Sequence, residues 1–459
     1  MKASRYNITS TDPATGRLVL FNTLYGSTVV VPPEEACEVV AALENPSNAQ
    51  SAEGTLVADL SRLKFIVNNE LDELALVLHR KEAGIKDSNR LDVIILPNLD
   101  CNFACPYCYE SHDRANRMSI QVRERLVKWL DATIPRHKML LLNWFGGEPL
   151  LSPDHIAAIT ESARRKCSVH GVRLLTNITT NGYALTHGMI ARLIALEIFS
   201  YQITVDGPAA THNKTRVLKS GKGTFERVFQ NIVAIARADA RVRVSVRVNY
   251  NHHNIYQIPE LIRLFPSDVR AQLRIVFEPV FGDAKLSATK NIDGAEISRF
   301  ITKCYEQAQS LGYDVRLGGL GVGRLVYCYA ERENQYIVDF KGDVFKCSVT
   351  DFSPDQRIGT IDNDGVFVRN DVKANEWFGA NLIDENCTQC TFLPLCMGGC
   401  RKDRIAHGAT GSYCHLVPTN TSQVLKSIAF GSFGAFLDKE TKTRAGCAQG
   451  SQQCDGCNS

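Results

Sequence analysis

The chain has 459 residues, which is enough for two or three domains with hydrophobic cores of their own. Hydrophobic residues make up 44% and charged residues 22%, so neither a disordered nor a membrane-spanning class fits. The net charge of +3 is too small to indicate a nucleic-acid partner. Sixteen cysteines in a long chain that starts without an apolar export signal favour metal binding over disulfides and predict a cytoplasmic protein.

Residues 1–88 are predicted to form a small module of their own. The pattern indicates two strands, 17–22 and 28–31, that turn around Tyr25 and Gly26, followed by a helix from Pro32-Pro33 to about residue 43. Two further helices, 56–63 and one that runs from a cap at Asn69 to about residue 81, flank a short strand at 65–67. This order resembles the winged-helix-like PqqD family, which implies a module that binds the leader of a ribosomal precursor peptide. The strands 17–22 and 28–31 form the candidate edge to which the peptide would add a strand. A purely structural N-terminal extension is the alternative.

Three cysteines, Cys101, Cys105 and Cys108, lie close together in the stretch LDCNFACPYCYE, in a CxxxCxxC spacing. Three thiolates on so short a loop can hold three corners of a cubic 4Fe–4S cluster and leave its fourth iron open. An apolar run at 91–96 leads into the loop, which places the cysteines at the C-terminal end of a predicted strand. Half of a zinc site, or three unrelated core cysteines, is the alternative.

From about residue 91 to residue 279, strand patterns alternate with helix patterns. Six buried, apolar strands separated by helices predict an α/β fold with a parallel sheet of βαβ units, either a partial barrel or an open sheet. In parallel barrels the active site lies at the C-terminal ends of the strands, where this chain has its polar and glycine residues. The predicted strands are 91–96, 139–145, 173–179, 198–205, 242–248 and 272–277, with helices such as 120–130 and 225–236 between them.

The cysteine loop, with Tyr107 before its last cysteine, resembles the signature of radical S-adenosylmethionine (SAM) enzymes. The stretch NWFGGEPLL after the second strand resembles the GGEP motif of that family, in which the backbone and the glutamate receive the SAM amino group. The resemblance implies that the open iron chelates SAM and that one electron cleaves it to a 5′-deoxyadenosyl radical. By the same resemblance, SAM would be bound by Gly146, Gly147, Glu148, Thr180, Asn181 and Asp206, and its carboxylate would pair with Arg216. The alternatives are that the motifs after the strands are ordinary turns and that Arg216 is a solvated loop arginine.

A bridging stretch, residues 281–325, contains a predicted helix at 296–309, in which Cys304 is expected to pack rather than to bind metal. Seven cysteines follow in the order C…GxxxxC…CxxCxxxxxCxxxC…C, with a predicted hairpin, 334–339 and 344–347, around the glycine. This order resembles the SPASM extension of radical SAM enzymes, which carries two auxiliary 4Fe–4S clusters. Zinc sites are the alternative, although seven thiolates do not divide into tetrahedral sets of four.

The resemblance also implies how the seven cysteines divide between the two clusters. An outer cluster would be held by Cys387, Cys390, Cys396 and Cys414, and an inner cluster by Cys328, Cys347 and Cys400. Sulfatase maturases of this family have a further cysteine shortly after the first and an aspartate base after the GxxxxC cysteine. Here the position of the aspartate base is occupied by Ser348. The stretch after Cys328 reads YAERENQ and has no cysteine, so the inner cluster lacks one protein thiolate. Its fourth ligand is predicted to be a substrate cysteine at an open iron, a tail cysteine (Cys447, Cys454 or Cys457), or an oxygen of Tyr327 or Tyr329.

The patterns divide the chain into an N-terminal module (1–88), a radical SAM partial barrel (89–280), a bridging region (281–325), a SPASM domain (326–425) and a Cys-containing tail (426–459). The resemblance implies a maturase that abstracts a hydrogen atom from a ribosomal precursor peptide. The product would be a thioether, a carbon–carbon cross-link or a cyclised side chain. SAM, three 4Fe–4S clusters and an external reductant such as flavodoxin or ferredoxin would be needed. An anaerobic sulfatase maturase and a non-catalytic iron–sulfur carrier or scaffold are the alternatives.

Overall fold

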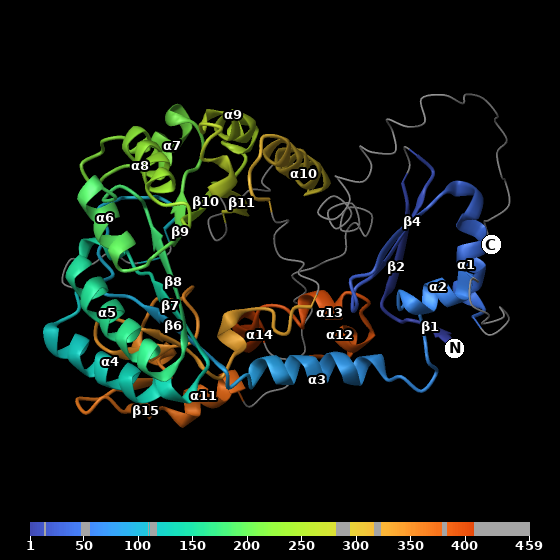
Figure 1. Ribbon diagram of the computed structural model, residues 1–459, viewed down its shortest axis with the longest axis horizontal. Helices are drawn as coiled ribbons and strands as arrows, with labels where there is room; N and C mark the ends of the chain where they lie inside the picture. The colour runs from blue at the N-terminus through green and yellow to red at the C-terminus, as the bar shows by residue number, and fades with distance from the viewer. Residues whose placement is uncertain are drawn as a thin grey trace.

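The computed structural model describes residues 1–12, 15–46, 56–108, 110, 117–280, 294–315, 323–378 and 383–407. Cys414 and the tail cysteines, on which several predictions depend, lie outside these residues. The described residues form a curved sheet surrounded by helices and a smaller module to one side of it (Figure 1).

Six parallel strands form the predicted partial barrel, which confirms the α/β fold class. They lie side by side in chain order, and each begins and ends within two residues of its predicted bounds. In the described part of the chain the outermost strands of the sheet do not pair with each other, so the barrel stays open. The strands are β6 (Arg90–Ile95), β7 (Met139–Trp144), β8 (Arg173–Thr180), β9 (Ser200–Thr204), β10 (Arg243–Tyr250) and β11 (Leu273–Pro279).

One face of these strands is apolar because alternate side chains point to the same side of a strand. Leu91, Val93 and Ile95 of β6 are fully buried, and so are their neighbours Leu140 and Leu142 of β7. The helices lie around the outside of the sheet (Figure 1), and the predicted helices 120–130 and 225–236 are among them. They are α4 (Ile120–Thr133), α5 (Pro153–His170), α6 (His187–Ala195), α7 (Ala209–Thr215), α8 (Phe225–Ala238) and α9 (Ile258–Leu264).

Four short strands extend the barrel sheet beyond β6, and the sequence did not predict this continuity. β12 (Gln335–Val338) runs parallel to β6, and the antiparallel strands β13 (Asp343–Phe345), β14 (Gly359–Ile361) and β15 (Phe367–Arg369) follow. β12 and β13 form the predicted hairpin, with Gly342 at a positive φ of 83° in the turn. The segment that carries the later cysteines is therefore fixed to the same sheet as the first cysteine loop.

Helices supply the rest of the C-terminal half. The predicted bridging helix is α10 (Gly294–Ser310), and Cys304 within it is buried. The helices of the cysteine-rich segment are α11 (Asp371–Phe378), α12 (Glu385–Gln389), α13 (Leu393–Cys396) and α14 (Arg401–His407). No helix in the described ranges combines the length and the apolar character that a membrane span requires.

The N-terminal module contains the predicted strands and helices and two strands that were missed. β2 (Asn7–Thr11), β3 (Leu18–Asn22) and β4 (Thr28–Val31) form one antiparallel sheet, while β1 (Lys2–Ala3) pairs with β5 (Ile66–Val67). The helices are α1 (Pro33–Glu44), α2 (Leu56–Arg62) and α3 (Glu73–Ile85). The prediction that Asn69 caps the last helix was wrong, because the Asp72 side chain accepts the Ala75 N–H at 2.9 Å.

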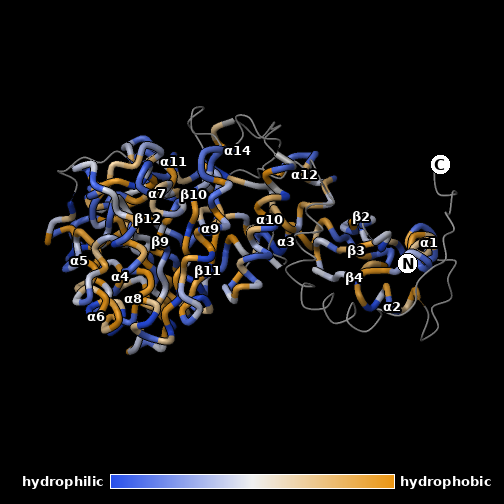
Figure 2. The backbone as a smooth tube through the Cα atoms, turned by 90° about the horizontal axis from the view of Figure 1, so that it is seen from above, coloured by the Kyte–Doolittle hydropathy of each residue, from blue (hydrophilic) through white to orange (hydrophobic). Residues whose placement is uncertain are grey.

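The module packs against the cysteine-rich segment. Figure 2 shows the β2–β3–β4 sheet to one side of the barrel, with α3 and α12 between them. Ile8 and Phe21 of this sheet share a hydrophobic cluster with Phe392 and Leu395. The Thr23 hydroxyl donates to the Thr391 carbonyl at 2.5 Å. The sheet that the sequence suggested for peptide binding therefore also supports the loop that follows Cys390.

Candidate functional site

The C-terminal ends of the barrel strands bring the predicted site residues together. Cys101, Cys105 and Cys108 follow β6, and their exposure increases from buried to exposed in that order. The Cys108 N–H donates to the Cys105 carbonyl at 3.1 Å, and the Phe103 N–H donates to the Cys101 sulfur at 3.4 Å. A tight turn thus presents three thiols to one region at the open end of the barrel.

Burial raises the pKa of the Cys101 thiol to about 12, and it also raises the pKa values of Cys105 and Cys108. Thiols whose pKa values are raised in this way become thiolates near neutral pH only when positive charge is bound beside them, which is what iron supplies. In the described part of the chain, no three His, Cys, Asp or Glu side chains converge as a single-ion site requires. In a cubic cluster each cysteine sulfur binds a different iron, so three cysteines can hold that group without converging on one ion.

Gly146 and Gly147 let the end of β7 lie directly against the backbone of the cysteine loop. A Cβ atom on Gly146 would lie 2.3 Å from the Asn98 carbonyl oxygen, and one on Gly147 would lie 2.2 Å from that of Asp100. Gly146 also has a positive φ of 119°. The next residue, Glu148, donates its N–H to the Asp100 carbonyl at 2.8 Å. The structure therefore supplies a packing reason for both glycines that sequence reasoning missed.

The Glu148 carboxylate is fully buried and joins the ends of β7 and β8. Its Oε1 accepts the Leu150 N–H at 3.0 Å and the Thr180 hydroxyl at 2.7 Å, and its Oε2 accepts the Asn181 N–H at 2.7 Å. Burial raises the pKa of Glu148, and these hydrogen bonds oppose the rise. The Asn181 amide donates to the Asn102 side chain at 2.7 Å, so the network reaches the cysteine loop. Three predicted site residues thus form one hydrogen-bonded unit.

A second network centres on Tyr107, which the sequence marked only as an aromatic within the cysteine motif. Its hydroxyl donates to Asp206 Oδ2 and accepts a hydrogen bond from Arg216 Nη1 at 2.9 Å. Asp206 also accepts the Thr215 hydroxyl at 3.1 Å and the Asn249 N–H at 3.3 Å. Burial raises the pKa of Tyr107 well above its usual value, so the phenol stays protonated. Tyr107 therefore ties the cysteine loop to the ends of β9 and β10.

Arg216 is buried beneath the cysteine loop and is not the solvated loop arginine of the alternative interpretation. Its guanidinium lies 5.4 Å from the centre of the Phe103 ring. Within the described residues, its Nε is buried and has no hydrogen-bond partner. A bound carboxylate would satisfy this donor, so the residue fits the predicted contact with the carboxylate of SAM.

The face of the sheet opposite the helices carries polar side chains among apolar ones such as Ile94 and Leu141, so the prediction of apolar strands holds mainly for the face that the helices cover. The pairing register places Asn143 beside Asn177, and Thr179 beside Gln202, which in turn lies beside Ser245. These five side chains are half-buried. Amides and hydroxyls on the inner face can hydrogen-bond a polar substrate such as a peptide.

The later cysteines form two neighbouring groups. Cys347 interacts electrostatically with both Cys328 and Cys400, and burial raises the pKa of each of the latter two to about 11. Cys387 and Cys390 bracket the end of α12, and Cys396 ends α13. The structure thus brings together the three thiols predicted for an inner cluster and places the described thiols predicted for an outer cluster on adjoining helices.

Two tyrosines were candidates for the fourth inner ligand. Burial raises the pKa of Tyr327, and the thiols of Cys400, Cys328 and Cys396 add to the effect, so this phenol lies between the two groups of cysteines. The Tyr329 hydroxyl instead lies 2.6 Å from the Ser348 hydroxyl, so it already has a hydrogen-bonding partner.

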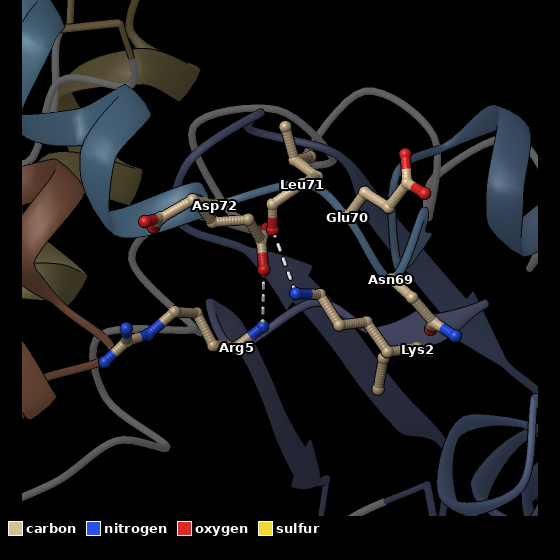
Figure 3. Close-up of a pocket in the computed structure, with 8 residues that line it drawn as sticks. Lys2, Arg5, Asn69, Glu70, Leu71 and Asp72 are labelled. Atoms are coloured by element: carbon tan, nitrogen blue, oxygen red, sulfur yellow. Dashed lines mark hydrogen bonds between the residues drawn. The ribbon is translucent and has the colours of Figure 1, made fainter.

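A surface pocket of about 270 Å³ lies apart from these groups, between the first strand and the start of α3 (Figure 3). Lys2 Nζ donates to the Leu71 carbonyl at 2.9 Å, and the Arg5 N–H donates to Glu73 Oε2 at 3.0 Å. The Arg5 guanidinium instead donates to the Thr388 carbonyl at 2.6 Å. The first two contacts join the N-terminal segment to the start of α3 and the third joins it to α12, so the pocket marks a structural junction.

Comparisons with known proteins extend these observations. Residues 95–265 match the family model of the radical SAM superfamily. The serine-type anaerobic sulfatase-maturating enzyme of Bacteroides thetaiotaomicron is 23% identical over 346 residues, covering 68% of this chain and 82% of that protein. The mycofactocin maturase MftC of Mycobacterium tuberculosis is 25% identical over 327 residues, covering 65% and 75% respectively. The structure of anSMEcpe with bound AdoMet and a Cp18Cys peptide has a TM-score of 0.56 at 20% identity, covering 77% of this chain and 100% of that chain. This likeness shows a shared fold.

Proposed function

Residues 95–265 form a radical SAM domain, and from this premise we propose that the protein is a maturase of a ribosomal precursor peptide. It would abstract a hydrogen atom from the peptide and form a thioether, a carbon–carbon cross-link or a cyclised side chain. The observation that carries the proposal is the meeting of three thiols, the Glu148 unit and the Tyr107–Asp206–Arg216 network at one end of the barrel. Both curated relatives are maturases, which supports the class of reaction.

A radical SAM domain uses SAM and one 4Fe–4S cluster. We assign Cys101, Cys105 and Cys108 to this cluster, which when bound would supply the one electron needed for reductive cleavage of SAM. The chain itself contributes position and charge. Arg216 offers its unpartnered Nε to the SAM carboxylate, while Asp206 and Tyr107 fix the guanidinium in place. Gly146, Gly147, Thr180 and Asn181 set the distance between the cysteine loop and the neighbouring strand ends.

Two auxiliary 4Fe–4S clusters complete the proposal. Their ligands would be Cys328, Cys347 and Cys400 for the inner cluster, and Cys387, Cys390, Cys396 and Cys414 for the outer cluster. Partial burial raises the pKa values of Cys328 and Cys387, one thiol from each group, so bound cations would be needed to ionise them, which supports the assignment. An external one-electron reductant such as flavodoxin or ferredoxin would supply electrons.

Precursor binding is assigned to residues 1–88. β3 pairs with β2 on one side and with β4 on the other, so the predicted edge at 17–22 is not open. Among the described strands, β4 pairs only with β3 and leaves its other edge for an added peptide strand. The Asn22 N–H donates to the Ser27 carbonyl, and the alternation of an antiparallel ladder then turns the backbone groups of Thr28 and Val30 outward.

The test is anaerobic incubation of the reconstituted protein with SAM, dithionite and the peptide encoded by a neighbouring short reading frame. We expect 5′-deoxyadenosine together with a peptide that has lost hydrogen atoms, measured by mass spectrometry. A protein that binds iron but yields no 5′-deoxyadenosine would instead be the electron carrier or scaffold.

Formylglycine formation is the second candidate, because one relative is a serine-type sulfatase-maturating enzyme, and the match covers 82% of that enzyme's length. The position of the aspartate base of those enzymes is Ser348 here, and it is hydrogen-bonded to Tyr329. Oxidation of a sulfatase-derived serine or cysteine peptide would favour this candidate, and modification of the neighbouring precursor alone would rule it out.

A further inference from the structure

A buried arginine holds the sulfur of Cys387. Arg404 lies on α14 with 5% of its surface exposed, and its Nη2 donates to the Cys387 sulfur at 3.0 Å. Its Nε donates to the Gly398 carbonyl, and its Nη1 lies 3.5 Å from Asp384 Oδ2. Three acceptors on three sides fix the guanidinium, so the contact with sulfur does not depend on a mobile surface side chain.

The acceptors of Arg404 are themselves part of the cysteine-bearing turn. Asp384 Oδ1 accepts the Cys387 N–H at 2.8 Å and so caps α12. Gly398 lies two residues after Cys396, at a positive φ of 91°. Arg404 therefore spans the segment from Cys387 to Cys396 and places one permanent positive charge beside it, because guanidinium does not lose its proton in proteins.

Hydrogen bonds and charges at the sulfurs set the reduction potential of an iron–sulfur cluster. Reduction adds one negative charge, and a buried cation stabilises the reduced state more than the oxidised state. Asp384 acts in the opposite direction, because its carboxylate lies beside the same guanidinium and offsets part of its charge. Loss of the Arg404 charge should therefore lower the reduction potential of the cluster, and loss of the Asp384 charge should raise it.

We propose that Arg404 raises the reduction potential of the outer auxiliary cluster through its hydrogen bond to the Cys387 sulfur and thereby makes this cluster the better electron acceptor. The inference rests on the proposed assignment of Cys387, Cys390, Cys396 and Cys414 to a cluster. It concerns a residue that the cysteine pattern does not include. Arg404 would act on the cluster through its ligand Cys387, so it is a positioning residue and not a catalytic one.

The experiment uses the full-length protein in which Cys101, Cys105 and Cys108 are alanine, so that only the auxiliary clusters contribute to the spectrum. Iron and sulfide are counted, and the clusters are titrated with a reductant while their electron paramagnetic resonance signals are followed. Cys387→Ala identifies the wave of the outer cluster. Arg404→Gln should move this wave to a more negative potential, by about 59 mV if the equilibrium constant for reduction falls tenfold.

Two further variants separate electrostatics from damage to the turn. Asp384→Asn keeps the cap on α12 and should move the wave to a more positive potential, while Arg404→Lys keeps the charge and should move it less than Arg404→Gln does. Arg80→Gln is the matched control, because this α3 arginine donates to the Leu24 carbonyl rather than to a sulfur. It should leave the wave in place.

Shifts of opposite sign in Arg404→Gln and Asp384→Asn support the proposal. An unmoved wave in Arg404→Gln, shifts of the same sign in both variants, or loss of the cluster iron from both Arg404 variants would overturn it. If the triple alanine protein with native Arg404 holds no iron, the proposed auxiliary clusters themselves are wrong, and that result is distinct from each of the others.

Discussion

Replacing Glu148 by glutamine tests whether the buried carboxylate holds the strand ends of the site in place. The amide has nearly the same shape, but only one of its two terminal atoms can accept a hydrogen bond. Its best orientation keeps an oxygen where Oε1 accepts the Leu150 N–H and the Thr180 hydroxyl. The NH₂ group then faces the Asn181 N–H, which is 2.7 Å from Oε2 in the native protein, so two donors meet.

The expected cost follows from these contacts. The buried Asn181 N–H loses its acceptor, which costs about 1–3 kcal/mol of stability. The two remaining hydrogen bonds, from Leu150 and Thr180, are no longer made to a charged acceptor. Removing a buried charge relieves part of its desolvation, which is the same burial that raises the pKa of Glu148. We therefore expect the free energy of unfolding to fall by about 1–3 kcal/mol. If the carboxylate also receives the SAM ammonium, the SAM dissociation constant rises as well, by about tenfold for 1.4 kcal/mol.

Urea unfolding of the reconstituted protein measures the first effect, and equilibrium dialysis against SAM measures the second. Asp154→Asn is the matched control, because Asp154 lies on the surface in the first turn of α5 and pairs with Arg192 at 2.7 Å. It should change stability by less than about 0.5 kcal/mol. If Glu148→Gln is as stable as this control, the hydrogen-bonded unit does not hold the strand ends. A less stable variant with an unchanged SAM dissociation constant would make Glu148 a positioning residue only.

Three further outcomes are expected. Changing Cys101, Cys105 and Cys108 together to alanine should leave about eight of about twelve irons and abolish SAM cleavage; wild-type levels of 5′-deoxyadenosine would refute the site. Val30→Pro removes an outward N–H from β4 and should weaken leader binding in a pull-down while peptide-independent SAM cleavage persists; unchanged leader binding would exclude this edge. Burial lowers the pKa of His212 to about 3, so the unfolded chain binds a proton below its ordinary pKa of about 6.5 and the native state does not. Stability should therefore fall by about 1.4 kcal/mol from this group between pH 7.5 and pH 5.5, and the fall should be absent in His212→Asn.

Sequence patterns predicted the features that are local along the chain. The strands were recognisable because each combines a short apolar run with a following turn, and the cysteine spacing marked both thiol-rich segments. Asp206 and Arg216 were placed at the site because the ends of neighbouring parallel strands meet at one edge of the sheet. The same locality explains two misses: β1 spans only two residues, and β2 reads NITST and lacks an apolar run.

Contacts between distant segments were not predictable, because no spacing rule connects them. Tyr107 and Asp206 are 99 residues apart and meet only when β6 and β9 have joined the sheet. β12 pairs with β6 across more than two hundred residues, although the sequence suggested a separate C-terminal domain. The role of Gly146 is also tertiary, since it depends on the Asn98 carbonyl that approaches from the cysteine loop.

The N-terminal module cannot be treated as a detachable binding unit. Lys81 of α3 forms a buried ion pair with Glu331 at 2.9 Å and donates to the Met397 carbonyl, between the two groups of later cysteines. Tyr6 is fully buried in a cluster with Leu393 and Met397. Deleting residues 1–88 would expose this apolar surface and leave Glu331 as a buried, unpaired charge, which is costly. Loss of peptide modification after such a deletion would not distinguish peptide binding from a collapsed cysteine segment. A substitution confined to the open edge of β4 makes that distinction, because this edge lies on the far side of β3 from β2 and contributes no residue to the clusters that join the module to α13.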